Sequence, residues 1–178
     1  MKIAVAILQT IDGYIARSNS DDLAWASKED RRFFVEKTME IGTMIMGSTT
    51  FNAMKMVKGT AFKGRRCLVL TSKPEDYANY KNEFTKVEFF KGSATEAAEY
   101  LEDQGVNQAI VIGGGKLIQQ FLEAGLINEI FVTIAPEIFG NGIKVCDGLI
   151  PDQKLELIDS KMISESEILL HYTITQPV

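Results

Sequence analysis

Three consecutive glycines stand where an apolar segment is expected to run into a helix, and this arrangement can bind phosphate. Residues 110–112 are apolar, Gly113, Gly114 and Gly115 follow them, and Lys116 begins the next stretch. Glycine lets an anion approach the main chain without a Cβ in the way. Free amides and the positive end of a helix dipole at a helix N-terminus suit a pyrophosphate. A tight turn would need the same glycines, so both interpretations stay open. The phosphate interpretation predicts cofactor contacts from Ile112, Gly113, Gly114, Gly115, Lys116 and Leu117.

Two further segments place glycine and hydroxyl groups where strands are expected to end. Residues 46–51 read Met-Gly-Ser-Thr-Thr-Phe, and residues 70–73 read Leu-Thr-Ser-Lys. Because ligands collect at the carboxyl ends of parallel strands, three such ends at one sheet edge suit a long anionic dinucleotide. Simple helix capping by Ser48 or Thr49 is the alternative. We expect cofactor contacts from Gly47, Ser48, Thr49, Thr50, Leu70, Thr71, Ser72 and Lys73.

Asp30 is the candidate acid. It falls in the first turn of an expected helix, beside an apolar side that includes Phe34. A carboxyl group in such a wall can have a raised pKa and can hydrogen-bond a nitrogen heterocycle. Asp30 also comes three residues after Ser27, where the partner in a capping box belongs. The spacing alone favours capping, and catalysis remains the alternative.

Charge and composition exclude several other classes of function. The net charge is −5, and the densest basic clusters, at residues 55–66 and at Arg31-Arg32, are too short for a nucleic-acid stripe. No run of eighteen apolar residues and no signal segment occurs, so we expect a cytoplasmic protein that binds neither membrane nor nucleic acid. Cys67 and Cys146 lie far apart, and we expect Cys67 to be a buried free thiol. With His171 as the single histidine, we expect neither a metal site nor a catalytic triad.

The elements that position these residues alternate between strands and helices. Such alternation predicts one α/β domain over residues 1–178, with a mostly parallel central sheet and helices on both faces. Two longer alternating strands near the C-terminus are expected to pair antiparallel at the sheet edge. We expect strands at residues 3–8, 43–46, 67–71, 87–90, 109–112, 130–135, 155–163 and 168–175, and helices from Ser27 to Gly42, 48 to 56, 93 to 104 and 116 to 124.

The order of these segments resembles the dihydrofolate reductase superfamily over nearly the whole chain. Residues 12–16, Asp-Gly-Tyr-Ile-Ala, look like the start shared with reductases related to the riboflavin-pathway deaminase-reductase. Trp25 precedes Asp30 as a tryptophan precedes the active-site acid of the family. The segment at 46–51 is similar to the family's Met-Gly-x-x-Thr-aromatic motif, and residues 112–115 match its Ile-Gly-Gly-x turn. Gly64-Arg65 and Thr133 also fall in register.

This resemblance implies a three-layer dihydrofolate reductase-like fold and a hydride transfer from NADPH to a flat heterocycle. Asp30 would be catalytic: it would anchor the heterocycle and support protonation of its imine nitrogen. Ser72 and Lys73 would pair with the 2′-phosphate, which favours NADPH over NADH. The resemblance implies substrate contacts from Ala6, Trp25, Phe34, Arg65 and Thr133, and adds Ile15 and Lys91 to the cofactor site.

The substrate is left open between two small molecules. Arg65 would receive the carboxylate of dihydrofolate or a related pterin. The start at residues 12–16 points instead to a ribosylated aminopyrimidine of riboflavin synthesis, whose sugar phosphate Arg31 could meet. A dinucleotide-binding module without activity is a third interpretation. Either a monomer or a homodimer is compatible with the sequence.

Overall fold

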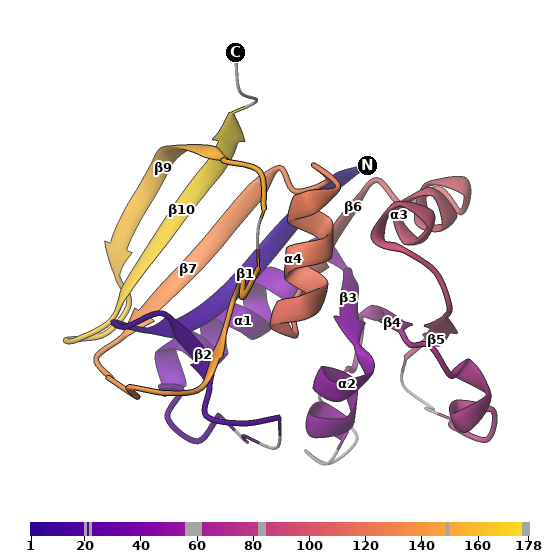
Figure 1. Ribbon diagram of the computed structural model, residues 1–178, viewed down its shortest axis with the longest axis horizontal. Coiled ribbons are helices and arrows are strands. Elements are labelled where there is room, and N and C mark those ends of the chain that lie inside the picture. The colour runs from indigo at the N-terminus through magenta and orange to yellow at the C-terminus, as the bar shows by residue number, and fades with distance from the viewer. Residues whose placement is uncertain (20, 22, 56–61, 82–84, 149, 176–178) are drawn as a thin grey trace.

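An eight-stranded sheet forms the centre of the protein (Figure 1). The computed structural model describes residues 1–19, 21, 23–55, 62–81, 85–148 and 150–175. The strands run in the order β5-β4-β3-β6-β1-β7-β10-β9. All neighbours from β5 to β7 are parallel, whereas β10 is antiparallel to both β7 and β9. The mostly parallel sheet with an antiparallel C-terminal edge is therefore confirmed. Its strands are β1 (Lys2–Thr10), β3 (Thr43–Gly47), β4 (Arg66–Leu70), β5 (Val87–Phe90), β6 (Gln108–Val111), β7 (Glu129–Ala135), β9 (Lys154–Met162) and β10 (Ile168–Thr175).

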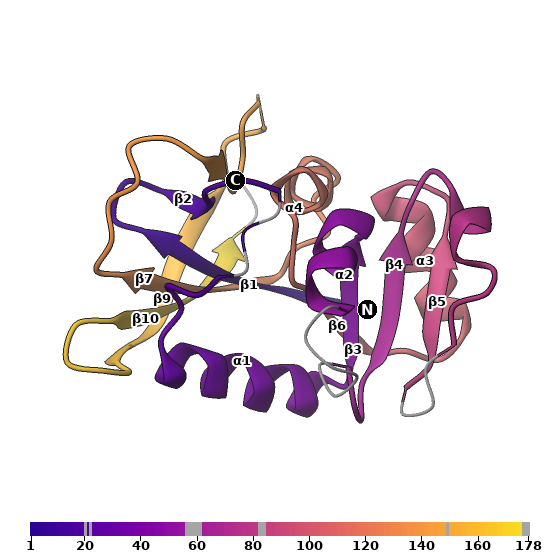
Figure 2. The ribbon, with the colours of Figure 1, turned by 90° about the horizontal axis from the view of Figure 1, so that it is seen from below.

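Helices cover both faces of this sheet, which completes the three layers expected. On one face lie α1 (Lys28–Ile41) and α2 (Ser48–Lys55), whose Phe33, Phe34 and Phe51 join a core cluster with Met44 and Val69. On the other face, α3 (Ala94–Asp103) and α4 (Gly115–Glu123) pack against a second cluster. Figure 2 shows α1 on the opposite side of the sheet from α3 and α4.

The helix ends follow from local sequence. The Ser27 side chain accepts a hydrogen bond from the amide of Asp30 at the start of α1, and Gly42 ends the helix in the left-handed conformation. Ser93 and Glu96 form a full capping box at the start of α3. The expected end of α2 at Met56 and most of the basic cluster at 55–66 lie outside the described residues.

A second, two-stranded sheet was not expected. It pairs β2 (Tyr14–Ala16) with β8 (Ile143–Lys144), and a short 3-10 helix, η1, spans Pro74–Tyr77. The carboxylate of Asp12 accepts hydrogen bonds from the amides of Phe139 (3.2 Å) and Gly140 (2.7 Å), which fixes the turn that leads into β8. Because β2 and β8 are short and far apart in the chain, hydrophobic periodicity carries no signal for their pairing.

Candidate active site

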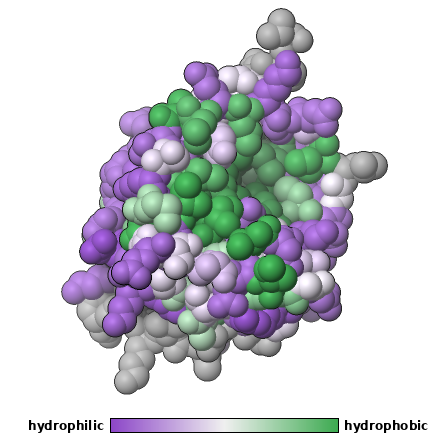
Figure 3. Space-filling view, turned by 90° about the vertical axis from the view of Figure 1, so that its left-hand side faces the viewer, coloured by the Kyte–Doolittle hydropathy of each residue, from purple (hydrophilic) through white to green (hydrophobic). Residues whose placement is uncertain are grey.

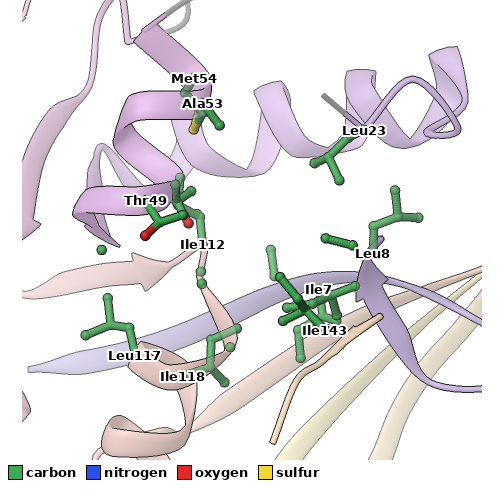
Figure 4. A pocket seen from close by; sticks show the side chains of 18 of the residues that line it. Ile7, Leu8, Leu23, Thr49, Ala53, Met54, Ile112, Leu117, Ile118 and Ile143 are labelled. Atoms are coloured by element: carbon green, nitrogen blue, oxygen red, sulfur yellow. The ribbon is translucent and has the colours of Figure 1, made fainter. Parts of the chain in front are cut away.

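One large cavity opens along the carboxyl ends of the parallel strands. It has a volume of about 1980 Å³, above the roughly 300–1,000 Å³ that is typical of a site for one small ligand. Figure 4 shows its apolar wall, in which Ile7 and Leu8 of β1 face Ile112, Leu117 and other side chains from several elements. The cavity therefore has room for two ligands side by side.

Three expected strand ends meet at this cavity. The amide of Gly47, at the end of β3, donates to the carbonyl of Gly113 at 2.9 Å, and the amide of Ile112 donates to the carbonyl of Ile45 at 3.0 Å. These bonds hold the glycine turn after β6 against the end of β3. A Cβ on Gly47 would lie only 3.8 Å from the amide nitrogen of Gly114. The two segments thus form one wall in which main-chain atoms face the cavity.

The N-terminus of α4 lies in this wall and carries no side-chain cap. Gly114 is the N-cap residue, and the first amides of a helix have no carbonyl partner within it. Gly115 is required by packing, because a Cβ there would lie 2.3 Å from the carbonyl oxygen of Lys144 and 3.5 Å from Cδ1 of Ile15. The second sheet is therefore packed directly on the start of α4, which brings Ile15 into the cavity wall.

The end of β4 extends the same wall. Leu70, Thr71 and Ser72 line the cavity, together with Lys91 after β5. The amide of Thr71 donates to the carbonyl of Phe90 at 2.9 Å, which joins the two strand ends. Lys73 does not line the cavity. Lys91 is a cation that the cavity offers to an anionic ligand.

Asp30 lies in the opposite part of the cavity wall, with 8% of its surface exposed. Its amide donates to Ser27 Oγ at 2.9 Å, so Asp30 takes part in capping through its main chain. In α3 the Glu96 side chain returns to the Ser93 amide at 2.7 Å, whereas the Asp30 side chain lines the cavity. Asp30 thus takes part in capping through its main chain and lines the cavity through its side chain.

Burial raises the pKa of the Asp30 carboxyl group. Interaction with the Thr133 hydroxyl lowers this pKa, the negative charge of Glu167 raises it, and the positive charge of Arg31 lowers it. The net direction is upward, so Asp30 holds its proton to a higher pH than an exposed aspartate does. Such a group can donate a proton or share one with a bound heterocycle.

Thr133 and Phe34 surround Asp30. Thr133 lies on β7 and is 1% exposed. Its hydroxyl group has no hydrogen-bond partner of standard geometry among the described residues. Phe34 lies one turn after Asp30 on α1, and Ala6 lies on β1 beside β7; all three line the cavity. An interior hydroxyl without a regular partner can bind a polar group of a ligand at low cost.

Arg65 and Trp25 were both expected to contact the substrate, and the structure shows each of them in a different setting. Arg65 lines the cavity but is 5% exposed, and its Nη1 donates to Oγ1 of Thr38 at 2.7 Å. Trp25 is not among the cavity-lining residues; it packs edge-to-face on Phe139, with ring centroids 5.1 Å apart. All other residues expected at the site, except Lys73, line the cavity.

Residues that the sequence did not indicate complete the wall. Lys144 and Ile143 of β8 take part, and a loop before α1 adds further polar and apolar groups. The guanidinium of Arg31, already a candidate partner for a sugar phosphate, is held at the wall by the carbonyls of Leu23 (2.7 Å) and Ala26 (3.3 Å). Gly142 was the available signal for β8, because a Cβ there would lie 2.4 Å from the carbonyl of Ala16. The loop residues are Ser18, Asn19, Asp21 and Leu23.

The part of the chain that the structure describes lacks two further kinds of feature. In that part of the chain, no cluster of His, Cys, Asp and Glu could hold a metal ion. Nor does any helix there have the length and apolar character needed to cross a membrane. Cys67 is a buried free thiol, as expected, and burial raises its pKa to about 12.

The sheet order and the helices on both faces define a dihydrofolate reductase-like fold. Dihydrofolate reductase from Enterococcus faecalis, solved with NADP(H) and RAB-propyl, matches with a TM-score of 0.68 and 21% identity, over 98% of this chain and 97% of that chain. A family model described as the RibD C-terminal domain matches residues 1–169. The chain belongs to this family.

Three other relatives are similar over nearly all of this chain. A putative riboflavin biosynthesis protein from Shewanella sp. PV-4 has a TM-score of 0.82 at 24% identity, and 99% and 100% of the two chains are covered. A diaminohydroxyphosphoribosylaminopyrimidine deaminase/5-amino-6-(5-phosphoribosylamino)uracil reductase from Thermotoga maritima has a TM-score of 0.81 at 19% identity, over 98% of this chain and 56% of that one. The uncharacterized protein YwjB of Bacillus subtilis (strain 168) is 25% identical over 175 residues, which are 96% of this chain and 97% of that protein.

Proposed function

We propose that the chain is an NADPH-dependent reductase that transfers a hydride to a planar nitrogen heterocycle, either dihydrofolate or a related pterin. The observation that carries this proposal is the buried carboxyl group of Asp30 in a cavity whose other wall is formed by glycine main chain. The first feature suits a heterocycle with N–H groups, and the second suits a dinucleotide diphosphate.

The glycine-lined wall fits the diphosphate of the cofactor. The amides at the start of α4, the hydroxyls of residues 48–50 and the missing Cβ atoms at Gly47 and Gly114 leave space and donors for two phosphates. Ser72 was expected to bind a 2′-phosphate together with Lys73, but Lys73 does not line the cavity, whereas Lys91 does. Ser72 and Lys91 would therefore bind the 2′-phosphate, which favours NADPH over NADH. When bound, NADPH supplies the hydride.

The remaining wall fits the substrate. Asp30 would accept hydrogen bonds from the amino group and ring nitrogen of the heterocycle, with Thr133 in the same network. The flat ring would pack against Phe34. The accepting form of Asp30 is the ionised carboxylate. Because burial raises the pKa of Asp30, its protonated form would also be populated, and that form would support protonation, through water, of the imine nitrogen that gains a proton during reduction.

A ribosylated aminopyrimidine is the second candidate substrate. Two observations favour it: the family match and the position of Arg31, whose guanidinium is fixed at the cavity wall by the carbonyls of Leu23 and Ala26. Arg31 is exposed, whereas Arg65 is buried and bonded to Thr38. A sugar phosphate can reach an exposed guanidinium at lower cost than a buried one.

A panel of two substrates tests both candidates. NADPH oxidation is followed with dihydrofolate and, separately, with 5-amino-6-(5-phosphoribosylamino)uracil, after calorimetry has measured the binding of NADPH and NADH. Turnover of dihydrofolate supports the first candidate, and turnover of the pyrimidine alone supports the second. Tight NADPH binding with neither reaction would indicate a binding module without activity. If neither nucleotide bound, the proposal would fail altogether.

A further inference from the structure

The carboxyl group of Glu167 is deeply buried, and the proposed reaction does not yet use it. Glu167 directly precedes β10 and is 3% exposed. Within the part of the chain that the structure describes, no basic group forms an ion pair with it. Acidic side chains are almost never this deeply buried without such a partner. The burial of Glu167 therefore calls for a reason other than charge pairing.

The sheet register places Glu167 beside Thr133. Thr133 of β7 is directly opposite Leu169 of β10, so the two residues share a face of the sheet. The amide of Ile163 donates to the carbonyl of Glu167 at 3.0 Å, which continues the pairing of β9 with β10 as far as Glu167. Because Glu167 is two residues before Leu169, it projects to the same face. Glu167 and Thr133 are thus diagonal neighbours, at a spacing of roughly 7–8 Å that long side chains can bridge.

The Thr133 hydroxyl neighbours both buried carboxyl groups. It interacts with the carboxyl group of Asp30, and the negative charge of Glu167 acts on the same group. All three residues are buried on the face of the sheet that α1 covers. A hydroxyl group can accept one proton and donate another. Thr133 can therefore connect Glu167 to Asp30.

The turn between β9 and β10 connects Glu167 to solvent. Ser164 Oγ donates to Oε2 of Glu167 at 3.2 Å and accepts from the amide of Glu167 at 3.1 Å. Ser164 is partly exposed, and Glu165 and Ser166 beside it are exposed. Figure 3 shows the side of the molecule on which β9 and β10 lie, where apolar side chains gather in the middle and hydrophilic ones surround them. Because apolar surface does not carry protons, the polar turn is where solvent can deliver one to Glu167.

A second, smaller pocket of about 180 Å³ lies between α1 and this turn. Met162 and Ile163 line it at the end of β9, and the charged side chains of Glu29 and Arg32 line it from α1. Phe33 lines both this pocket and the large cavity, so α1 separates the two. A water molecule takes up about 30 Å³ in the liquid. The small pocket thus has room for several waters beside the turn.

The proposed reaction consumes the proton of Asp30. In each turnover the substrate gains one hydride and one proton, and the protonated form of Asp30 supports the proton transfer. Asp30 is 8% exposed, and in the proposed complex the heterocycle would cover the side of its carboxyl group that faces the cavity. A path from the opposite side would restore the proton while the ligands are still bound.

We infer that Glu167 passes protons from solvent to Asp30 through the Thr133 hydroxyl, by a path that does not cross the cavity. This inference rests on the proposed function, because the reduction is what consumes the proton of Asp30. After each reduction, the Asp30 carboxylate takes a proton from the Thr133 hydroxyl, and Thr133 takes one from the carboxylic acid of Glu167. Water at the turn then returns a proton to Glu167. Each O–H bond that breaks is replaced by one that forms, so the path carries one proton per turnover and needs no oxidant or reductant. Glu167 acts through Asp30 and does not touch the substrate.

The test separates kcat from kcat/KM. Recovery of the Asp30 proton after the reduction contributes to kcat, whereas kcat/KM covers the steps from free enzyme and substrate to the reduction itself. Both constants are measured by NADPH oxidation with the substrate that the wild type reduces, on the low-pH plateau of kcat/KM, where Asp30 is protonated in every variant. We expect Glu167→Gln to lower kcat about tenfold or more and to leave kcat/KM within about twofold of the wild type. Glutamine keeps the size of the side chain and still accepts from Ser164 Oγ, but it cannot pass on the proton. Glu165→Gln, in the same turn, is the control and should change neither constant.

The buffer concentration distinguishes a lost proton path from a structural defect. A small buffer acid can protonate Asp30 through the cavity once the product has left. The kcat of Glu167→Gln should therefore rise with buffer concentration at constant pH and ionic strength, whereas the kcat of the wild type should not. Circular dichroism and the melting temperature check that each variant is folded.

Several outcomes would overturn the proton path. A wild type that reduces neither substrate of the panel would remove the proposed function and the path with it. An active wild type whose Glu167→Gln variant keeps its kcat would overturn the path alone. The same conclusion holds if Glu165→Gln lowers kcat as much as Glu167→Gln does. It also holds if kcat and kcat/KM of Glu167→Gln fall together and buffer restores neither, since that pattern indicates a structural role.

Discussion

The two parts of the cavity are built from different kinds of atoms. The part formed by β3, β4 and β6 presents main-chain groups and glycines, whereas the part formed by β1, β7 and α1 presents the side chains of Asp30, Phe34 and Thr133. Main-chain amides at a helix start recognise any phosphate, so this part is suited to a common cofactor. Side chains can be exchanged without changing the fold, so the other part can set the substrate. Under the proposed function, substitutions in the second part could therefore change the substrate while the first part keeps the same cofactor.

Replacing Asp30 with asparagine should have the largest effect, and it should act on one part of the cavity alone. Asparagine keeps the size of the side chain but cannot supply the proton, so kcat/KM for the substrate should fall by about 10²-fold or more. The Kd for NADPH should not change, because the glycine-lined wall is untouched. Glu29→Gln is the matched control, since Glu29 is adjacent and does not line the cavity. Equal losses in both variants, or unchanged turnover in Asp30→Asn, would remove Asp30 from the mechanism.

Gly47→Ala should affect the opposite part. A Cβ at Gly47 would make ordinary contacts, 3.8 Å from the Gly114 amide nitrogen, so the fold should keep its melting temperature. The added methyl occupies space beside the amides that are proposed to hold the diphosphate. NADPH affinity should therefore fall about tenfold or more, which corresponds to about 1.4 kcal/mol or more. Calorimetry measures this loss.

Gly115→Ala provides the contrast for that experiment. Its Cβ would lie 2.3 Å from the carbonyl oxygen of Lys144, so the main chain must move. We expect both weaker NADPH binding and a loss of about 1–3 kcal/mol in the free energy of unfolding. If Gly47→Ala destabilised the fold as much as Gly115→Ala does, the affinity loss could not be assigned to the phosphate site.

The Asp30→Asn substitution should also change the free energy of unfolding. This effect is smaller than the loss of activity, and it favours the variant over the wild type as pH rises. Because burial raises the pKa of Asp30 above its value in the unfolded chain, the folded wild type loses stability as pH rises from the unfolded pKa to the folded one. Asparagine does not titrate. The free energy of unfolding of Asp30→Asn relative to wild type should therefore increase from about pH 4, near the unfolded pKa, towards pH 7. Urea titrations at several pH values measure it, and a relative decrease towards pH 7 would contradict the raised pKa.

Much of the fold and of the two parts of the cavity could be predicted from the sequence because the signals for them are local. The apolar runs of β1 and β6, the cap at Ser27 and the left-handed Gly42 each depend on a few neighbouring residues. Parallel strands then bring their carboxyl ends to one edge, which is why the glycine segments met as expected. The same logic could not decide between the two roles of Asp30, since both begin with the same spacing from Ser27.

What the sequence could not predict depends on contacts between distant segments. The pairing of β2 with β8 places Lys144 against Gly115, and neither strand is long enough to show a period. The bulge in β9, where Leu157 is opposite Tyr172 and Asp159 is opposite His171, is also invisible in the sequence, although it changes which side chains of the strand share a face. Likewise, Glu167 is 3% exposed, directly precedes β10, and raises the pKa of Asp30 through its negative charge. No spacing in the sequence indicates this relation.

Glu167→Gln should have the smallest effect on kcat/KM, and it tests whether the charge of Glu167 influences the pKa of Asp30. The negative charge of Glu167 contributes to the raised pKa of Asp30, after burial and against the opposing influence of Thr133 and Arg31. Removing that charge should lower the pKa of Asp30. If protonated Asp30 is required, kcat/KM falls as pH rises through this pKa, so in the variant the fall should begin at a lower pH.

The matched control for this experiment is Glu165→Gln, because Glu165 is exposed in the same turn and is not among the groups that shift Asp30. Its pH profile of kcat/KM should superpose on that of the wild type. A purely structural role of Glu167, through its contact with Ser164 Oγ at 3.2 Å, would lower stability without moving the profile. A shift of the profile to higher pH would be incompatible with the proposed influence of Glu167 on Asp30, whereas a shift to lower pH in Glu167→Gln alone would show that a residue outside the cavity tunes its acid.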